Sequence, residues 1–142
     1  MIIENSRIFE ISNAVSNALG PNYVVTASVA QYPKSKGDFE GVIHDVIDTN
    51  TGEEVFSIHE EYDDERTLSI YRISMGIAFP NCSEELKDIE FSTGEFLLSE
   101  FSRDFLQKSA LIFFETFVSD ISEEKYKAAL DYCYDHVSLE VK

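Results

Sequence analysis

The chain has 142 residues, of which 44% are hydrophobic and 13% aromatic, and its 27 acidic and 11 basic residues give a formal net charge of −16. This apolar content excludes a disordered acidic tail, and a chain of this length buries enough surface for one core. The negative charge excludes direct binding to nucleic-acid phosphates or anionic lipid headgroups and favours a basic protein as partner. We therefore expect residues 1–142 to form a single acidic domain.

The sequence contains no sign of a membrane span or an export signal. Its longest apolar run, residues 110–114, stops at Glu115 and is far shorter than the roughly 20 residues that a transmembrane helix needs. The first residues lack a basic segment followed by an apolar segment and a cleavage site. We expect a cytoplasmic protein without membrane contact. Cys82 and Cys133 lack a CxxC spacing and neighbouring histidines, which predicts two idle thiols.

The N-terminal part predicts a helix followed by a strand. Over residues 5–19, Ile8, Ile11 and Val15 recur at helical spacing, and the Gly-Pro pair that follows ends the helix. Residues 23–30 are rich in β-branched side chains and alternate with period two, as in a strand. We expect the apolar side of the helix to pack on the sheet to which this strand belongs.

The middle of the chain predicts three more strands. Residues 39–48 and 55–59 alternate in the same way, and a short turn at 50–52 with Asn and Gly joins them into an antiparallel hairpin. Residues 67–77 predict a further strand. Its apolar positions change from even to odd numbers, which indicates a β-bulge near Ile70.

The last third of the chain is mostly helical in pattern. Residues 93–107 predict a helix, whereas the apolar run 110–118 fits either a buried strand or a buried helix, with the strand preferred. Ser122 followed by acids predicts the N-cap of a last helix. The expected fold class is α+β, with a largely antiparallel four- to five-stranded sheet and the N-terminal and C-terminal helices packed on one face.

The most distinctive feature is residues 37–65, which contain eleven acids and no lysine or arginine. Because this interval forms the predicted hairpin and the loop after it, we expect its charge to gather at one end and edge of the sheet. Acids there serve either solubility and the protection of a strand edge, or the docking of a cationic protein. We take the docking function as the hypothesis, with these candidate partner-binding residues: Asp45, Asp48, Glu53, Glu54, Glu60, Glu61, Asp63, Asp64 and Glu65.

Three patterns in the same interval resemble parts of metal sites. The carboxylates of residues 60–65 suit Ca²⁺, but nothing holds them in register, and residues 48–52 look like the start of an EF-hand loop except that the glycine falls one position early. If the hairpin places His44 opposite Ser57, then His44 and His59 lie diagonally on one face, as two zinc ligands would. A third ligand is not evident, and a shift of one residue would separate the two. We expect no metal and no cofactor.

No motif of an enzyme is found. The sequence lacks GxSxG, P-loop, HExxH and GxGxxG patterns, and neither cysteine has a histidine placed by a local signature. We expect no catalytic activity. Seven phenylalanines of the C-terminal half fit either an apolar ligand pocket or a groove for a partner helix, although their helical spacing favours core packing: Phe91, Phe96, Phe101, Phe105, Phe113, Phe114 and Phe117.

These features favour a non-enzymatic inhibitor of a basic protein, such as a bacterial immunity protein that neutralises a nuclease toxin, because a nuclease site must be cationic to hold phosphates. The alternatives are a phage-type DNA mimic that blocks a nucleic-acid enzyme, and an acidic secretion chaperone, for which dimerisation and apolar grooves are expected. On this hypothesis, association should slow about tenfold or more, with little loss of stability, when four acids are reversed to lysine: Glu60, Glu61, Asp63 and Asp64.

Overall fold

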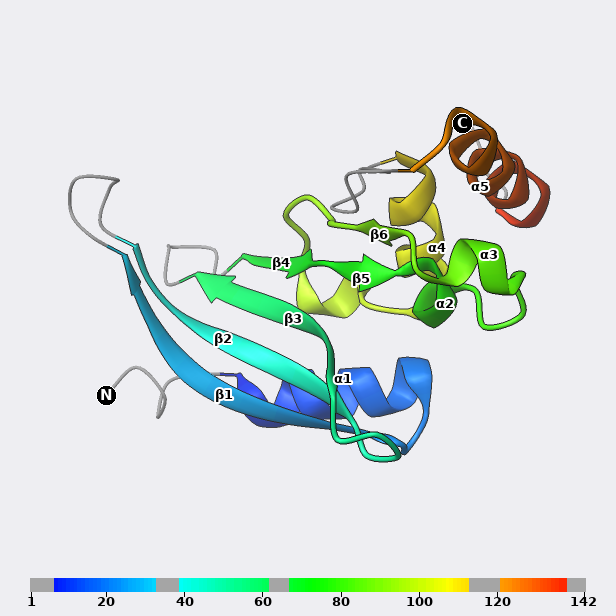
Figure 1. Cartoon of the computed structure of the whole chain (residues 1–142). Helices are drawn as coiled ribbons and strands as arrows, with labels where there is room; N and C mark the ends of the chain where they lie inside the picture. Colours follow the sequence, from blue (N-terminus) through cyan, green and yellow to red (C-terminus); the bar gives the residue numbers. More distant parts are fainter. Residues whose placement is uncertain (1–6, 33–38, 62–66, 113–120, 138–142) are drawn as a thin grey trace.

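The computed structural model describes residues 7–32, 39–61, 67–112 and 121–137, and they form the expected α+β fold (Figure 1). A four-stranded antiparallel sheet is accompanied by a small two-stranded sheet and five helices. The elements in chain order are α1 (Ile8–Leu19), β1 (Tyr23–Tyr32), β2 (Phe39–Asp48), β3 (Glu54–Glu61), β4 (Leu68–Tyr71), β5 (Ile73–Ser74), α2 (Met75–Ala78), α3 (Glu84–Lys87), β6 (Glu90–Phe91), the 3₁₀ turn η3 (Leu98–Glu100), α4 (Arg103–Ile112) and α5 (Glu123–His136).

The strands of the larger sheet follow the order β1-β2-β3-β4, so the predicted hairpin of β2 and β3 is confirmed. Its register contains an irregularity that the sequence did not reveal. Ile47 pairs with Glu54 but Val46 pairs with Phe56, so Val55 is an extra residue in β3. Because side chains alternate between faces, a shift of one residue changes which residues lie opposite each other along the rest of the hairpin.

The predicted strand over residues 67–77 is instead divided between two sheets and a helix. It stops at Tyr71, and Arg72 has φ 60°, a left-handed conformation that costs a non-glycine residue about 1–2 kcal/mol. Beyond it, β5 pairs with β6 and α2 follows. Ile70 and Ile73, on either side of Arg72, are both fully buried. The change of parity therefore reflects a sharp turn at Arg72 rather than the expected bulge near Ile70.

The segment before α4 runs beside β4 instead of forming the helix predicted over residues 93–107. The hydroxyl oxygen of Thr93 accepts a hydrogen bond from the backbone N–H of Ile70 at 2.9 Å. Leu68 and Phe96 exchange two backbone hydrogen bonds, of 3.2 and 2.9 Å. Pairing with β4 therefore prevails over helical periodicity here, and the helix begins only at Arg103.

The last two helices bear out one prediction and correct another. Residues 110–112 form the end of α4, so the expected strand is wrong there, and residues 113–118 lie outside the described ranges. Ser122 caps α5 as predicted, with its hydroxyl oxygen accepting a hydrogen bond from the backbone N–H of Lys125 at 3.1 Å. In α5, Ala129 and Cys133 are fully buried, and the helix packs on α3 and α4.

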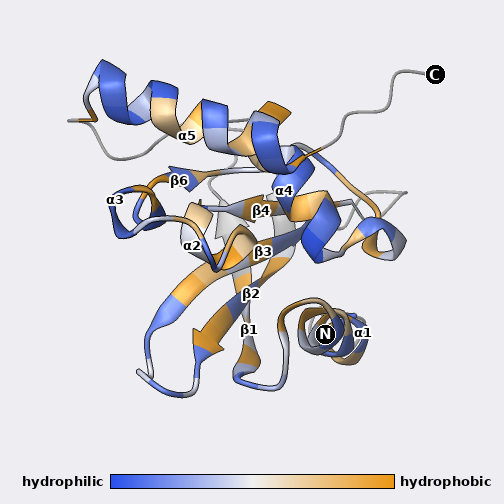
Figure 2. Cartoon of the chain, turned by 90° about the vertical axis from the view of Figure 1, so that its right-hand side faces the viewer, coloured by the Kyte–Doolittle hydropathy of each residue, from blue (hydrophilic) through white to orange (hydrophobic). Residues whose placement is uncertain are grey.

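The core lies between the larger sheet and the helices. Ile11 and Val15 of α1 are fully buried, and α1 packs on β1 (Figure 1). Figure 2 shows α1 against one side of β1–β3, whereas α5 lies at the end of the molecule far from the β2–β3 turn. Phe91, Phe96 and Phe101 belong to the core, as their spacing suggested. Within the described residues, no helix has the length and apolarity needed to cross a bilayer.

Candidate functional site: an acidic groove

An open groove of ≈ 700 Å³ is formed by three segments that are distant in the sequence. They are the start of β3, the turn between β4 and β5, and the segment from α3 to β6. We call it the acidic groove, because four of its lining side chains are carboxylates. It is lined by Glu53, Glu54, Val55, Phe56, Arg72, Ser74, Asp88 and Glu90.

Two carboxylates of the acidic groove come from outside the acidic interval of the sequence. Antiparallel pairing of β5 with β6 places Glu90 opposite Ser74, and a backbone hydrogen bond of 2.7 Å joins Met75 to Ile89. This brings Asp88 and Glu90 to the groove, opposite the start of β3. Sequence reasoning missed both, because a pair of strands only two residues long leaves no periodic signal.

Arg72 is the one basic residue among those that line the acidic groove. Its Nε donates to Oε2 of Glu90 at 3.3 Å, and two thirds of the arginine side chain is exposed. One guanidinium faces four carboxylates, so the groove keeps a net negative charge. Since Arg72 also adopts the left-handed conformation at the turn, the same residue shapes the groove and partly neutralises it.

The carboxylates near the acidic groove are close enough to raise the pKa of one of them, Glu54. Partial burial raises the pKa of Glu54 above its usual value, and the charge of Asp45 and a hydrogen bond with Asp45 raise it further, while Arg72 acts in the opposite direction. Asp45 lies on β2, opposite Ser57. Crowded carboxylates bind a cationic group more favourably than isolated ones, because its charge relieves their repulsion.

The other predicted partner-binding residues lie elsewhere. Asp48 is the last residue of β2, and its Oδ1 accepts a hydrogen bond of 2.8 Å from the backbone N–H of Asn50 in the turn. Glu61 is half-buried at the end of β3, and Asp63, Asp64 and Glu65 fall outside the described residues. Of the predicted set, the structure brings Glu53 and Glu54 together in the groove, with Asp45 beside them.

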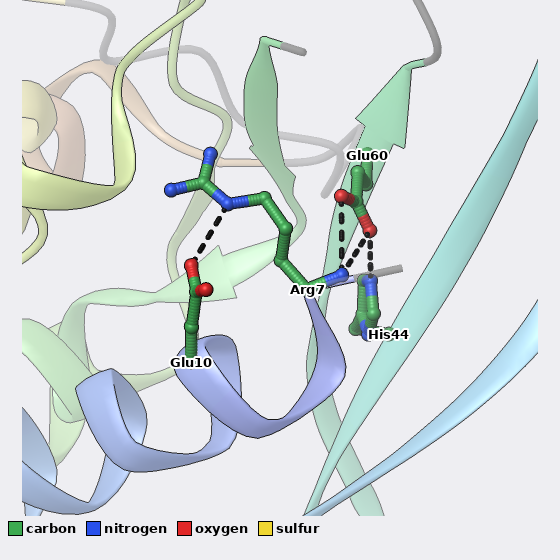
Figure 3. A network of polar contacts seen from close by, with 4 residues as sticks. All are labelled: Arg7, Glu10, His44 and Glu60. Atoms are coloured by element: carbon green, nitrogen blue, oxygen red, sulfur yellow. Dashed lines mark hydrogen bonds and ion pairs between the residues drawn. The ribbon is translucent and has the colours of Figure 1, made fainter. Parts of the chain in front are cut away.

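Glu60 is not a surface residue, so its place in the predicted partner-binding set is wrong. Its side chain and that of His44 are fully buried, and His44 Nε2 lies 2.9 Å from Glu60 Oε1 (Figure 3). Both carboxylate oxygens also accept from the backbone N–H of Arg7, at 3.4 Å. Glu60 thus ties the start of α1 to β3. The sequence contained a signal for this burial, because alternate residues of a strand share a face and Glu60 lies on the same face as the buried Phe56 and Ile58.

The two histidines that suggested a zinc site, His44 and His59, lie on opposite faces of the sheet. Because of the extra residue in β3, His44 pairs with Ile58 and not with Ser57, and its side chain points into the core. His59 is on the other face, where it contacts the Tyr71 ring at a centroid distance of 4.2 Å. The described residues contain no group of three or more potential ligands that could hold a metal ion.

We expect His59 to make folding stability depend on pH. Burial lowers the pKa of His59, the nearby His44 lowers it further, and Asp45 opposes both. The unfolded chain therefore binds a proton more readily than the folded chain, so this contribution is present above the ordinary pKa of about 6.5 and is lost as the pH falls below it. Urea unfolding at pH 7.5 and 5.5 should show a smaller pH-dependent loss in His59→Gln than in wild type. Equal losses would contradict this assignment.

Both cysteines are free and buried. Burial raises the pKa of the Cys133 thiol to about 11 and also raises that of Cys82, which Lys87 partly offsets. The two thiols therefore remain protonated at neutral pH and are poor nucleophiles.

Comparisons with protein families, with curated proteins and with solved structures each found no match for this chain.

Proposed function

We propose that this chain is a non-enzymatic inhibitor of a basic protein and acts in the cytoplasm as an immunity protein that neutralises a toxin such as a nuclease. The observation that carries the proposal is the acidic groove, which four carboxylates and one arginine from separate segments line in a chain of net charge −16. The groove is open, so a protruding cationic segment of a partner has access to the carboxylates.

The physical basis is electrostatic complementarity. A nuclease must hold phosphates with lysine and arginine, so its active site attracts carboxylates that are presented at a fixed geometry. Glu54 extends from the larger sheet, directly after Glu53 in the preceding turn, and Glu90 extends from the smaller sheet, which supports such a geometry. A concentrated negative field also accelerates encounter, by about 10–10³-fold. A DNA mimic directed against a nucleic-acid enzyme would use the same groove, and the identity of the bound partner separates the two functions.

Charge reversal in the acidic groove tests the proposal. We choose Glu53→Lys, Glu54→Lys and Asp88→Lys, because these three side chains are exposed, and we spare Glu90, which pairs with Arg72. Wild-type protein should capture a basic partner from a lysate of its native host. At low salt, the triple variant should associate with the purified partner at least about tenfold more slowly than wild type does. Stopped-flow kinetics measure this, and added salt should slow wild type much more than the variant.

The matched control reverses three exposed acids elsewhere: Glu95→Lys, Asp131→Lys and Asp135→Lys. It carries the same net charge as the groove variant, so it should lose much less of the association rate if position matters as well as total charge. A groove variant that associates as fast as wild type at low salt would show that the acidic groove is not the interface.

A further inference from the structure

One stretch of this highly charged chain carries no charge. Residues 11–33 contain no Asp, Glu, Lys, Arg or His, although 27% of the whole chain is charged. The stretch comprises nearly all of α1 and the whole of β1, and these two elements pack on each other. The molecule therefore has a neutral side built from α1 and β1, in contrast to the acidic groove.

The strand β1 forms an edge of the larger sheet, and within the described residues no strand pairs with its outer side. It is ten residues long, contains no proline, and keeps an unbroken register with β2. Natural proteins protect such edges with charges, prolines, bulges or shortness. The opposite edge strand, β4, is four residues long and is bridged by Phe96. By this criterion β4 is protected and β1 is not, which indicates that something covers β1.

We propose that β1 pairs with β1 of a second copy of this chain in an antiparallel dimer, which joins the two four-stranded sheets into one. Two copies of charge −16 repel each other, so their contact costs least where the surface carries no charge. A basic partner, in contrast, is drawn to carboxylates and finds none on β1. The proposal goes beyond the inhibitory function and does not depend on it.

The sequence of β1 suits pairing about a two-fold axis. An axis perpendicular to the sheet keeps each face continuous, so opposed residues must lie on the same face. With Ala27 on the axis, Thr26 stands opposite Ser28 of the second copy, and Val25 opposite Val29. The first pair consists of two exposed hydroxyl side chains, and the second of two β-branched side chains on the face towards α1.

The surface next to β1 extends this contact. A specific interface usually buries about 1,200–2,000 Å² in total, which is more than paired strands alone provide. Val24 and Val29 are 45% and 39% exposed, and Phe9, in the first turn of α1, is 82% exposed. The two-fold axis places both α1 helices on the same side of the joined sheet, where their uncharged exposed residues add to the buried area.

The first test is the mass in solution. Wild-type protein at tens of micromolar should sediment with twice the 16.2 kDa mass of the chain. Salt should strengthen the dimer, because it screens the repulsion between the two copies. Binding of a basic partner in the acidic groove should instead weaken with salt, so the two proposals fail in different ways. A wild-type protein that is monomeric at both low and high salt would overturn the dimer.

Paired substitutions test the register. Thr26→Glu with Ser28→Glu places like charges directly opposite each other twice and should give a monomer, whereas Thr26→Gln with Ser28→Gln should remain a dimer. Thr26→Glu with Ser28→Lys places opposite charges together and should restore the dimer. Circular dichroism and urea midpoints should show that all three variants fold. A dimer that survives the Glu/Glu pair, or a Glu/Lys variant no more dimeric than Glu/Glu, would overturn the proposal.

Discussion

Replacing Glu60 with alanine should lower the free energy of unfolding by about 3–5 kcal/mol, because it leaves buried polar groups without their partner. The carboxylate accepts from the backbone N–H of Arg7 and lies 2.9 Å from Nε2 of the buried His44 (Figure 3). Among the residues that the structure describes, the other ring nitrogen of His44, Nδ1, has no hydrogen-bond partner, and the contact with Glu60 satisfies Nε2. Urea denaturation at pH 7.5 measures the loss.

Glu53→Ala is the matched control, because Glu53 is an exposed acid directly before the same strand, β3. Its replacement should change the free energy of unfolding by no more than about 0.5 kcal/mol. His44→Ala alone should also be destabilising, and the His44→Ala, Glu60→Ala double variant should lose less than the sum of the two single losses. Similar, small effects for Glu60→Ala and Glu53→Ala would contradict the buried position of Glu60. Because Glu60 is buried, reversing it to lysine would disturb the fold and is unsuitable as a test of binding.

Replacing Phe91 with alanine should destabilise the protein by about 3–5 kcal/mol, as large-to-small changes at buried phenylalanines do. Phe91 is fully buried and pairs with Ile73 in the two-stranded sheet of β5 and β6. Strands of two residues have few backbone hydrogen bonds, so packing of this side chain holds β6 in place. Because β6 also carries Glu90, the loss should extend to the shape of the acidic groove.

The control for Phe91 is Leu97→Ala, an apolar side chain that is 51% exposed and should change the free energy of unfolding by no more than about 0.5 kcal/mol. Urea unfolding compares the two variants. Hydrogen exchange should in addition show faster exchange at β5 and β6 in Phe91→Ala. Equal stabilities of the two variants would show that β6 is held by other contacts.

Charge is distributed unevenly over this protein. The acidic groove gathers carboxylates from β3 and from the α3–β6 segment, whereas α1 and β1 carry no charge after Glu10. A uniform distribution would give the same net charge and solubility. This uneven distribution is the basis of the two proposals, a cationic protein bound at the acidic groove and a second copy of the chain paired at β1.

Local pattern was sufficient for those elements whose side chains repeat over many residues. The helix α1, the hairpin of β2 and β3, and the cap of α5 at Ser122 all follow from periodicity and turn or cap residues within a few positions. In each case the determining interactions are between near neighbours in the chain. The candidate binding residues Glu53, Glu54 and Asp45 came instead from the concentration of acids over residues 37–65, and their role stays a prediction.

Contacts between distant segments decided the rest. The extra residue Val55 places His44 and His59 on opposite faces of the sheet instead of the same face. The turn at Arg72 divides one apparent strand between two sheets. Asp88 reaches the acidic groove only through the pairing of β5 with β6, and Glu60 is drawn into the core by the start of α1 and by the neighbouring strand. A carboxylate has the same local sequence signal whether it faces water or a buried donor, so its role depends on which partner the tertiary structure places beside it.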